Sequence, residues 1–361
     1  MQSALTILAG DTAFERIASQ GLSPQSFGAV VGASGGAKML ALTHLDRYIF
    51  GEFLPASEHR VELVGSSIGA WRHAAAATRN PIASLTALQE RYLNQSWDEN
   101  DPRPRAQIVD ELCDWVLNGF YDDDTARQVC EHPRYVTHIV TARGRGLNGA
   151  PASPLLGLGL AGSATLNTLH RSLLSLGFQR VVFSAGPSLA FSFRDFATEH
   201  VALTPALLKI ALLASGSIPF LMSGQHSIPG APRGRYWDGG IVDYHFDLSN
   251  LRSDELVLYP HFGERVVKGW FDKALPWRFT PVKELSNVLL VAPSLAYLER
   301  LPHGRIPDRK DFKRMDRADR LRAWKHAMSA SQALADSFAD VVNAADPVRY
   351  IARFGGGKRD R

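Results

Sequence analysis

Residues 61–71 constrain the fold of this chain most, because they read as an apolar strand, a tight turn and the start of an alanine-rich helix, V-E-L-V-G-S-S-I-G-A-W. The turn has the pattern Gly-x-Ser-x-Gly, with Ser67 between Gly65 and Gly69. Glycines at these positions remove the β-carbons that would clash where the strand and the helix pass closest. The helix also directs its N-terminal amides at the serine hydroxyl. The segment therefore predicts a catalytic serine, although a glycine-rich turn without chemistry can have the same pattern.

Strands and helices alternate through the first part of the chain. Apolar runs predict strands at residues 27–31, 61–64, 135–142, 180–184 and 255–259. Periodic segments predict helices at residues 11–20, 70–78, 81–130 and 203–214, and one that ends near residue 48. The stretch 149–176, rich in Gly, Ala and Leu, separates two of the strands. The βαβα order indicates a parallel sheet with right-handed crossovers and helices on its faces.

The composition is that of a soluble globular protein, with 45% hydrophobic and 21% charged residues. The two cysteines cannot build a disulfide framework and suit a reducing compartment. The N-terminus lacks the basic flank of a signal peptide, and the most apolar stretch, at residues 203–222, is interrupted by Lys209 and two prolines. We therefore expect a cytoplasmic protein.

The C-terminal segment 301–361 is basic, with 14 Lys or Arg residues against 8 Asp or Glu, whereas the net charge of the whole chain is +4. We expect a catalytic domain over residues 1–300 and a helical extension over 301–361, with an apolar stripe on a helix at 316–342. The bases expected to face outward are Arg314, Arg317, Arg320 and Lys325. They could attract an anionic membrane peripherally, whereas the interleaved acidic residues favour an ordinary solvated helix, and nucleic acid is not expected.

A second glycine loop, G-A-S-G-G-A-K-M at residues 32–39, opens another helix. It lacks the glycine spacing of a dinucleotide fingerprint and the Lys-Ser/Thr ending of a nucleotide-binding P-loop. The backbone amides of Gly35, Gly36 and Ala37 are free of side-chain bulk, as the donors of an oxyanion hole must be. The loop contains a Gly-x-Ser-x-Gly pattern of its own, so Ser34 competes with Ser67 as the nucleophile.

An Asp-Gly-Gly sequence follows later, at Asp238, Gly239 and Gly240. Taken alone, such a tripeptide is usually a turn. The order of glycine loop, Gly-x-Ser-x-Gly turn and Asp-Gly-Gly, preceded by A-S-G-S-I-P at residues 214–219, resembles that of the patatin-like phospholipases. The resemblance covers residues 25–245, and the set of motifs is specific although no single motif is.

The resemblance implies a three-layer α/β/α sandwich with a mostly parallel sheet, and a serine lipid acyl hydrolase that acts on acyl esters. It makes Ser67 the nucleophile, Asp238 the base, and the amides of Gly35, Gly36 and Ala37 the oxyanion hole. No histidine, metal or cofactor takes part in such a dyad. The chain departs from the family pattern in its glycine loop, through Ser34 in place of glycine, Lys38 in place of arginine and Met39 in place of glycine.

Two other functions remain open from the sequence. The order Ser67, Asp238, His261 also fits a Ser-His-Asp esterase of the α/β-hydrolase type, with His245 as a second histidine in the same region. A module that binds lipid or membrane without catalysis would use the basic C-terminal segment instead.

Two further segments have two interpretations each. The acidic run at residues 122–124 either binds a cation or caps a helix N-terminus, and the cap is favoured. The segments 268–273 and 277–279 mix aromatic and basic residues, as membrane-interface loops and half-buried aromatic clusters both do.

Overall fold

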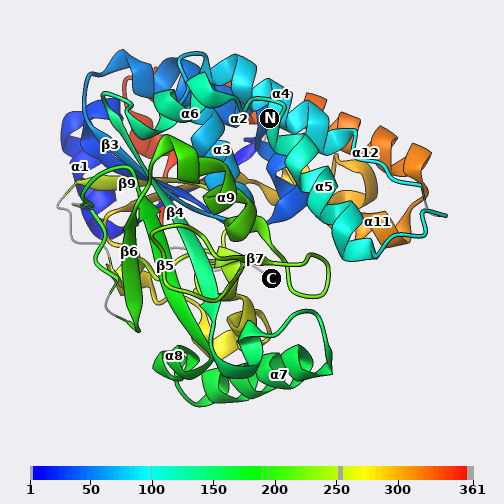
Figure 1. Ribbon diagram of the computed structural model, residues 1–361. Helices are drawn as coiled ribbons and strands as arrows, with labels where there is room; N and C mark the ends of the chain where they lie inside the picture. The colour runs from blue at the N-terminus through cyan, green and yellow to red at the C-terminus, as the bar shows by residue number, and fades with distance from the viewer. Residues whose placement is uncertain (1–2, 99, 189, 194, 251–254, 356–361) are drawn as a thin grey trace.

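The computed structural model describes residues 3–98, 100–188, 190–193, 195–250 and 255–355. A mixed, mostly parallel sheet lies at its centre, with helices packed around it (Figure 1). The strands are β1 (Leu5–Ala9), β2 (Phe27–Gly32), β3 (Val61–Ser66), β4 (Tyr135–Gly144), β5 (Phe178–Ser184), β6 (Thr198–Ala202), β7 (Gln225–His226), β8 (Arg235–Trp237), β9 (Leu256–Pro260), β10 (Val288–Pro293) and β11 (Ala352–Arg353). The predicted α/β fold class is confirmed.

Helices connect and cover these strands. The α-helices are α1 (Asp11–Gln20), α2 (Thr43–Tyr48), α3 (Ile68–Ala76), α4 (Pro81–Leu93), α5 (Arg105–Leu117), α6 (Asp123–Cys130), α7 (Pro154–Leu169), α8 (Leu174–Gly177), α9 (Pro205–Gly216), α10 (Leu295–Leu298), α11 (Asp311–Arg314), α12 (Arg317–Ala330) and α13 (Gln332–Val342). A 3₁₀ segment, η2 (Gly36–Leu42), precedes α2, so the helix predicted to end near residue 48 begins in a tighter form. Among the described residues, no helix is both long and apolar enough to cross a bilayer.

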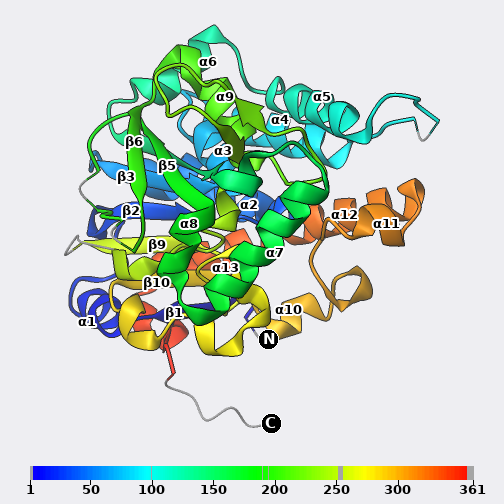
Figure 2. The same cartoon turned by 60° about the horizontal axis from the view of Figure 1, so that its bottom comes forward.

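The strand order is β11-β1-β10-β9-β2-β3-β4-β5-β6, and Figure 2 shows β3, β2, β9, β10 and β1 side by side in that order. The central run from β10 to β4 is parallel, whereas β1 with β10 and β4 with β5 are antiparallel. The register pairs Gly32 of β2 with Gly65 of β3. Both glycine loops therefore leave the sheet from the same edge, at the carboxyl ends of two neighbouring strands, where ligands of parallel sheets bind.

The central strands are buried on both faces, since all six residues of β2, β3 and β10 are buried. A nearly continuous apolar sequence is what a parallel strand covered by helices requires. Helix α3 packs close to this core through Gly69, where a β-carbon would lie 2.0 Å from the carbonyl oxygen of Gly32. In the same way, a β-carbon on Gly65 would lie 2.6 Å from the backbone nitrogen of Ala70. These two glycines let the strand and the helix meet at the turn.

The C-terminal segment differs from its prediction in two ways. The helix predicted over residues 316–342 is interrupted at Ser331, a fully buried residue that ends α12 and precedes α13. Its hydroxyl accepts a hydrogen bond from the backbone nitrogen of His44, so this joint is tied to α2. The expectation that Arg320 faces outward is wrong, because its guanidinium packs over Phe312 and Trp324 and it is only 5% exposed. The division at residue 300 stays a prediction.

Replacing Gly69 by alanine tests the close packing of helix against strand. The added β-carbon meets backbone that cannot move freely, so we expect Gly69→Ala to lower the free energy of unfolding by about 1–3 kcal/mol or more. Gly162→Ala on α7 is the matched control, because its β-carbon meets nothing within 4 Å. It should leave stability unchanged or raise it by about 0.5–1 kcal/mol, as a helical Gly→Ala change does. Equal denaturation midpoints for the two variants would contradict this account.

Candidate active site

Ser67 lies at the junction of β3 and α3 in a backbone conformation that side chains seldom adopt, with φ of 54° and ψ of −130°. Such strain is found at sites where the surrounding structure fixes the backbone. Here the backbone nitrogen of Ser67 donates to Ser215 Oγ at 2.8 Å, and Ser215 Oγ donates to the carbonyl oxygen of Val140 at 2.7 Å. Ser67 itself is 7% exposed, so its hydroxyl reaches the surface only through a cavity.

Asp238 follows β8 directly and faces Ser67. Ser67 Oγ donates to Asp238 Oδ2 at 2.7 Å, and the backbone nitrogen of Gly240 donates to Asp238 Oδ1, also at 2.7 Å. Burial raises the pKa of Asp238 above its ordinary value, and the hydrogen bonds from Ser67 and Gly240 oppose that rise only in part. Both carboxylate oxygens are thus held in place, one by the serine and one by the glycine of the Asp-Gly-Gly sequence. The structure brings together the two side chains that the sequence singles out.

The glycine loop after β2 borders the same cavity. Gly35 and Gly36 line it with Ser67, whereas Ala37 is fully buried and does not. Among the described residues, the N–H groups of Gly35 and Gly36 donate to no partner, so they are available to a ligand. Gly36 has φ of 56°, a left-handed conformation that glycine adopts without strain. Two of the three amides that the sequence proposes for an oxyanion hole therefore lie beside Ser67.

Ser34 also lines the cavity, but its hydroxyl has other partners. Ser34 Oγ forms a hydrogen bond of 2.8 Å with Ser66 Oγ, and its backbone nitrogen donates to the carbonyl oxygen of Tyr244 at 2.9 Å. The hydroxyl in direct contact with Asp238 is that of Ser67. The geometry therefore distinguishes the two serines that the sequence leaves in competition.

Among the described residues, neither His261, the histidine of the alternative triad, nor the nearby His245 forms a hydrogen bond with Ser67 or Asp238. His261 Nδ1 is within hydrogen-bond reach of the carbonyl oxygen of Gly263, and burial lowers the pKa of this ring to about 4. His245 Nδ1 accepts a hydrogen bond from the backbone nitrogen of Val267 at 3.1 Å. The two rings pack edge to face, with centroids 4.2 Å apart. Since Ser67 donates directly to Asp238, this arrangement has no imidazole between them.

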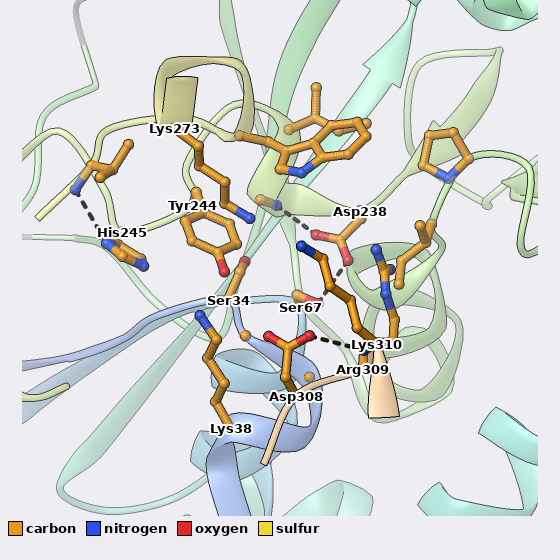
Figure 3. Close-up of a pocket in the computed structure, with 18 of the residues that line it drawn as sticks. Ser34, Lys38, Ser67, Asp238, Tyr244, His245, Lys273, Asp308, Arg309 and Lys310 are labelled. Carbon is orange, nitrogen blue, oxygen red and sulfur yellow. Dashed lines mark hydrogen bonds between the residues drawn. The ribbon is translucent and has the colours of Figure 1, made fainter. Parts of the chain in front are cut away.

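The cavity has a volume of about 630 Å³ and contains both Ser67 and Asp238 (Figure 3). Its walls combine apolar groups with an unusual number of basic side chains. The apolar and aromatic residues are Tyr92, Ile218, Pro219, Ile241, Tyr244, Val267, Trp270 and Phe279. The charged residues besides Asp238 are Lys38, Arg265, Lys273, Asp308, Arg309 and Lys310.

Most of these lining residues were not found from the sequence. Trp270, Lys273 and Phe279 belong to the two segments that mix aromatic and basic residues, and they line the cavity, whereas Trp277 is 69% exposed. The membrane-interface interpretation of these segments stays a prediction. Residues 308–310 belong to the charge run read as a solvated helix face. Ser215 was noticed only as part of the A-S-G-S-I-P stretch.

The acidic run at residues 122–124 is a helix cap. Asp122 Oδ1 accepts a hydrogen bond from the backbone nitrogen of Thr125 at 2.7 Å, and the Thr125 hydroxyl accepts one from the backbone of Asp122. This reciprocal pair is a capping box at the start of α6. In the part of the chain that the structure describes, no three His, Cys, Asp or Glu side chains come together to hold a metal ion.

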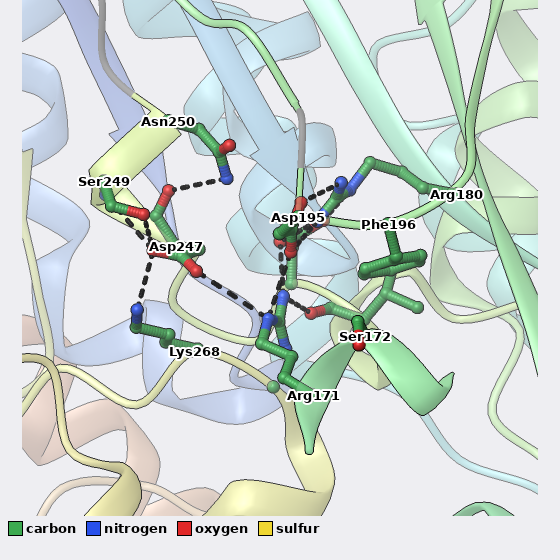
Figure 4. A network of polar contacts seen from close by, with 12 residues as sticks. Arg171, Ser172, Arg180, Asp195, Phe196, Asp247, Ser249, Asn250 and Lys268 are labelled. Carbon is green, nitrogen blue, oxygen red and sulfur yellow. Dashed lines mark hydrogen bonds and ion pairs between the residues drawn. The ribbon is translucent and has the colours of Figure 1, made fainter. Parts of the chain in front are cut away.

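A buried polar network holds the loop that follows Asp238 (Figure 4). Arg180 is fully buried and donates to Asp243 Oδ2 at 2.6 Å and to Asp195 Oδ1 at 2.7 Å. Arg171 donates to the carbonyl oxygen of Val242 at 2.7 Å. Burial raises the pKa of Asp243 against the opposing charge of Arg180. Burial alone would also raise the pKa of Asp195, but Arg180 and Arg171 lower it overall.

Comparisons with known proteins place these observations in a family. The family model for patatin-like phospholipase matches residues 31–245, well over half of the chain. No curated protein matches the sequence. Among solved structures, human GIVD cytosolic phospholipase A2 is similar at 11% sequence identity, with 93% of this chain and 67% of that chain covered and a TM-score of 0.35.

Removing Arg180 tests the network behind the loop. Arg180→Met leaves Asp243 and Asp195 buried without their main cation, so we expect the free energy of unfolding to fall by about 3–5 kcal/mol. Arg322→Met is the control, because Arg322 pairs with Asp319 at an exposed position and its loss should cost at most about 0.5 kcal/mol. Urea denaturation measures both variants. A similar small effect for the two would show that the buried network does not stabilise the fold.

Proposed function

We propose that this protein, which belongs to the patatin-like phospholipase family, hydrolyses acyl esters of lipids with Ser67 as nucleophile and Asp238 as base. The direct 2.7 Å hydrogen bond from Ser67 Oγ to Asp238 Oδ2 is the observation that carries this proposal. A serine is a weak nucleophile unless an adjacent base accepts its proton, and the carboxylate is in position to do so. Members of this family are generally lipid acyl hydrolases.

The first half-reaction begins when Ser67 Oγ attacks the carbonyl carbon of the ester and its proton passes to Asp238 Oδ2. The carbonyl oxygen becomes an oxyanion, and the N–H groups of Gly35 and Gly36 are close enough to the cavity to stabilise it. When the tetrahedral intermediate collapses, the ester C–O bond breaks and the departing alkoxide takes the proton from Asp238. An acyl group then remains on Ser67 Oγ.

Water completes the reaction by the same route. It attacks the acyl carbon while Asp238 accepts its proton, and collapse of the second intermediate returns the proton to Ser67 Oγ and releases a carboxylic acid. The raised pKa of Asp238 favours this role, because a base works best when its pKa approaches the pH at which the enzyme acts. An alcohol in place of water would give transacylation at the same site.

We propose further that the protein is cytoplasmic and contacts anionic membrane surfaces peripherally. Phe220, which follows the lining residues Ile218 and Pro219, is 53% exposed. Leu155 and Leu158 of α7 are 54% and 64% exposed, and a β-carbon on Gly157 between them would lie 3.6 Å from the ring of Phe220. Exposed apolar side chains that gather beside a cavity are typical of surfaces that meet lipid.

Substitution of Ser67 tests the nucleophile. Ser67→Ala removes the attacking oxygen and should lower kcat for a short-chain p-nitrophenyl ester by about 10⁴-fold or more. A fluorophosphonate probe should label the wild-type protein on Ser67, as found by peptide mapping, and should still label Ser34→Ala. Probe attached to Ser34, or hydrolysis that survives Ser67→Ala, would refute the assignment.

The pH dependence of kcat/KM tests the base. Asp238 must be deprotonated to accept the serine proton, and burial raises its pKa above the ordinary 3.8. With the uncharged p-nitrophenyl ester as substrate, activity should therefore be constant at higher pH and be lost as the pH falls through that raised pKa, earlier than for an exposed aspartate. Circular dichroism over the same range separates this loss from unfolding. An acid limb centred at or below 3.8 while the protein is folded would contradict the role given to Asp238.

A further inference from the structure

The basic residues that line the cavity have no counter-ion. In the described part of the chain, none of them forms an ion pair, and the set is Lys38, Arg265, Lys273, Arg309 and Lys310. Of these five, Lys38 is half-buried and the other four are exposed, whereas the half-buried Lys268 contacts both Asp247 and Glu284. Among the described residues that line the cavity, Asp308 and Asp238 are the acidic ones, and Asp238 is engaged by Ser67 and Gly240. The cavity therefore has an excess of positive charge that the protein itself does not balance.

Two of these lysines approach the dyad from different parts of the chain. Lys38 belongs to the glycine loop, and Lys273 to a 3₁₀ segment at Trp270–Ala274, beyond the residues that the family model matches. Figure 3 shows their amino groups directed into the space beside Ser67 and Tyr244. The ammonium of Lys273 lies 3.4 Å from the centre of the Tyr244 ring, a cation–π contact that fixes its position.

The ring of His245 stacks on the ring of Tyr244, with centroids 4.4 Å apart, and Figure 3 shows it on the side of Tyr244 opposite the amino group of Lys273. Its Nδ1 accepts a hydrogen bond from the backbone of Val267, so the proton of the neutral ring is on Nε2. Burial lowers the pKa of His245 well below its ordinary value, which keeps the ring neutral. His245 lines the cavity, and a hydrogen bond with the backbone of Arg265 partly opposes the lowering of its pKa. Because the Tyr244 ring lies between them, His245 and Lys273 do not contact the same oxyanion, and the lysines alone are left for it.

We propose that Lys273 and Lys38 form a subsite for the phosphate of an anionic headgroup, so that the enzyme prefers acyl esters of anionic phospholipids to those of zwitterionic or neutral lipids. This inference rests on the proposed function, because it names the substrate class of the same site. Both ammonium groups donate hydrogen bonds, and an oxyanion accepts from both of them. The ammonium of a zwitterionic headgroup would instead meet the uncompensated bases around it.

Short-chain lipids that stay monomeric in solution provide the test, because they remove attraction to a charged interface. We expect kcat/KM to be higher for dihexanoyl phosphatidylglycerol than for dihexanoyl phosphatidylcholine or dihexanoylglycerol. Lys273→Met should lower the ratio of kcat/KM for the phosphatidylglycerol to kcat/KM for the phosphatidylcholine by about tenfold, as the loss of one charge-assisted hydrogen bond would. Lys38→Met should lower it too, and Lys273→Arg should restore most of it. Lys325→Met, which removes an exposed lysine outside the cavity, should leave the ratio unchanged.

The pH dependence of KM for the phosphatidylglycerol distinguishes a Lys273 that binds the headgroup phosphate from a Lys273 that is merely structural. Burial, followed by repulsion from Lys38, lowers the pKa of Lys273 to about 7, although its side chain also reaches solvent. Lys273 is charged below this pKa, so KM for the phosphatidylglycerol should rise as the pH increases above about 7, whereas Lys273→Arg should not show the rise. The phosphodiester keeps one negative charge throughout. The other groups that face Lys273 are Lys38, Asp238, Tyr244, His245, Asp308 and Arg309.

The possible outcomes distinguish this inference from the proposed function. Hydrolysis of all three lipids at equal rates, unaffected by Lys273→Met, would overturn the subsite and leave the hydrolase intact. If no ester is cleaved, the hydrolase proposal fails, and calorimetry with inorganic phosphate decides on the subsite alone. Phosphate that binds the wild-type protein and Lys325→Met but not Lys273→Met would support the subsite, and absence of binding to the wild-type protein would overturn it.

Discussion

The backbone contact between Gly32 and Gly69 is the constraint on which the rest of the site depends. Only glycine at position 69 lets α3 pass so close to the end of β2, because any β-carbon there would lie 2.0 Å from a carbonyl oxygen. The parallel register sets Gly32 opposite Gly65, so the glycine loop and the turn at Ser67 leave the sheet together. The strained φ of 54° at Ser67, a conformation that costs about 1–3 kcal/mol, is maintained by these buried strands.

A chain of hydrogen bonds then joins the three sequence motifs into one unit. Ser34 Oγ contacts Ser66 Oγ at 2.8 Å, and Ser66 Oγ donates to the carbonyl oxygen of Asp243 at 2.5 Å. At the other end of Asp243, its side-chain carboxylate accepts a hydrogen bond from Arg180. The glycine loop, the residue before Ser67 and the loop after Asp238 are thus connected through buried polar groups. This gives Ser34, a departure from the family pattern, a structural explanation: its hydroxyl ties the glycine loop to the strand that carries Ser67.

The sequence predicted those features whose cause is local. A tight turn between strand and helix needs glycine at fixed positions, so the motifs around Ser67 and Asp238 could be recognised without the fold. Strands β1 and β10 were not recognised, because a short apolar run can be a strand or part of a helix, and their pairing joins residues 280 or more positions apart. The basic cavity wall was missed for the same reason. Lys273 and residues 308–310 resemble ordinary surface charge until the fold brings them beside Lys38.

Burial raises the pKa of Asp238 in the cavity and lowers the pKa of Lys273, and the two groups also influence each other. Removal of water raises the pKa of Asp238, which makes it a better base, and lowers the pKa of Lys273, which makes its charge easier to lose. The positive charge of Lys273 lowers the pKa of Asp238, so it opposes the effect of burial on the base. An anionic group held at Lys273 would neutralise part of that charge and raise the pKa of Asp238 further. A substrate with such a group would thereby strengthen the base that acts on its own ester.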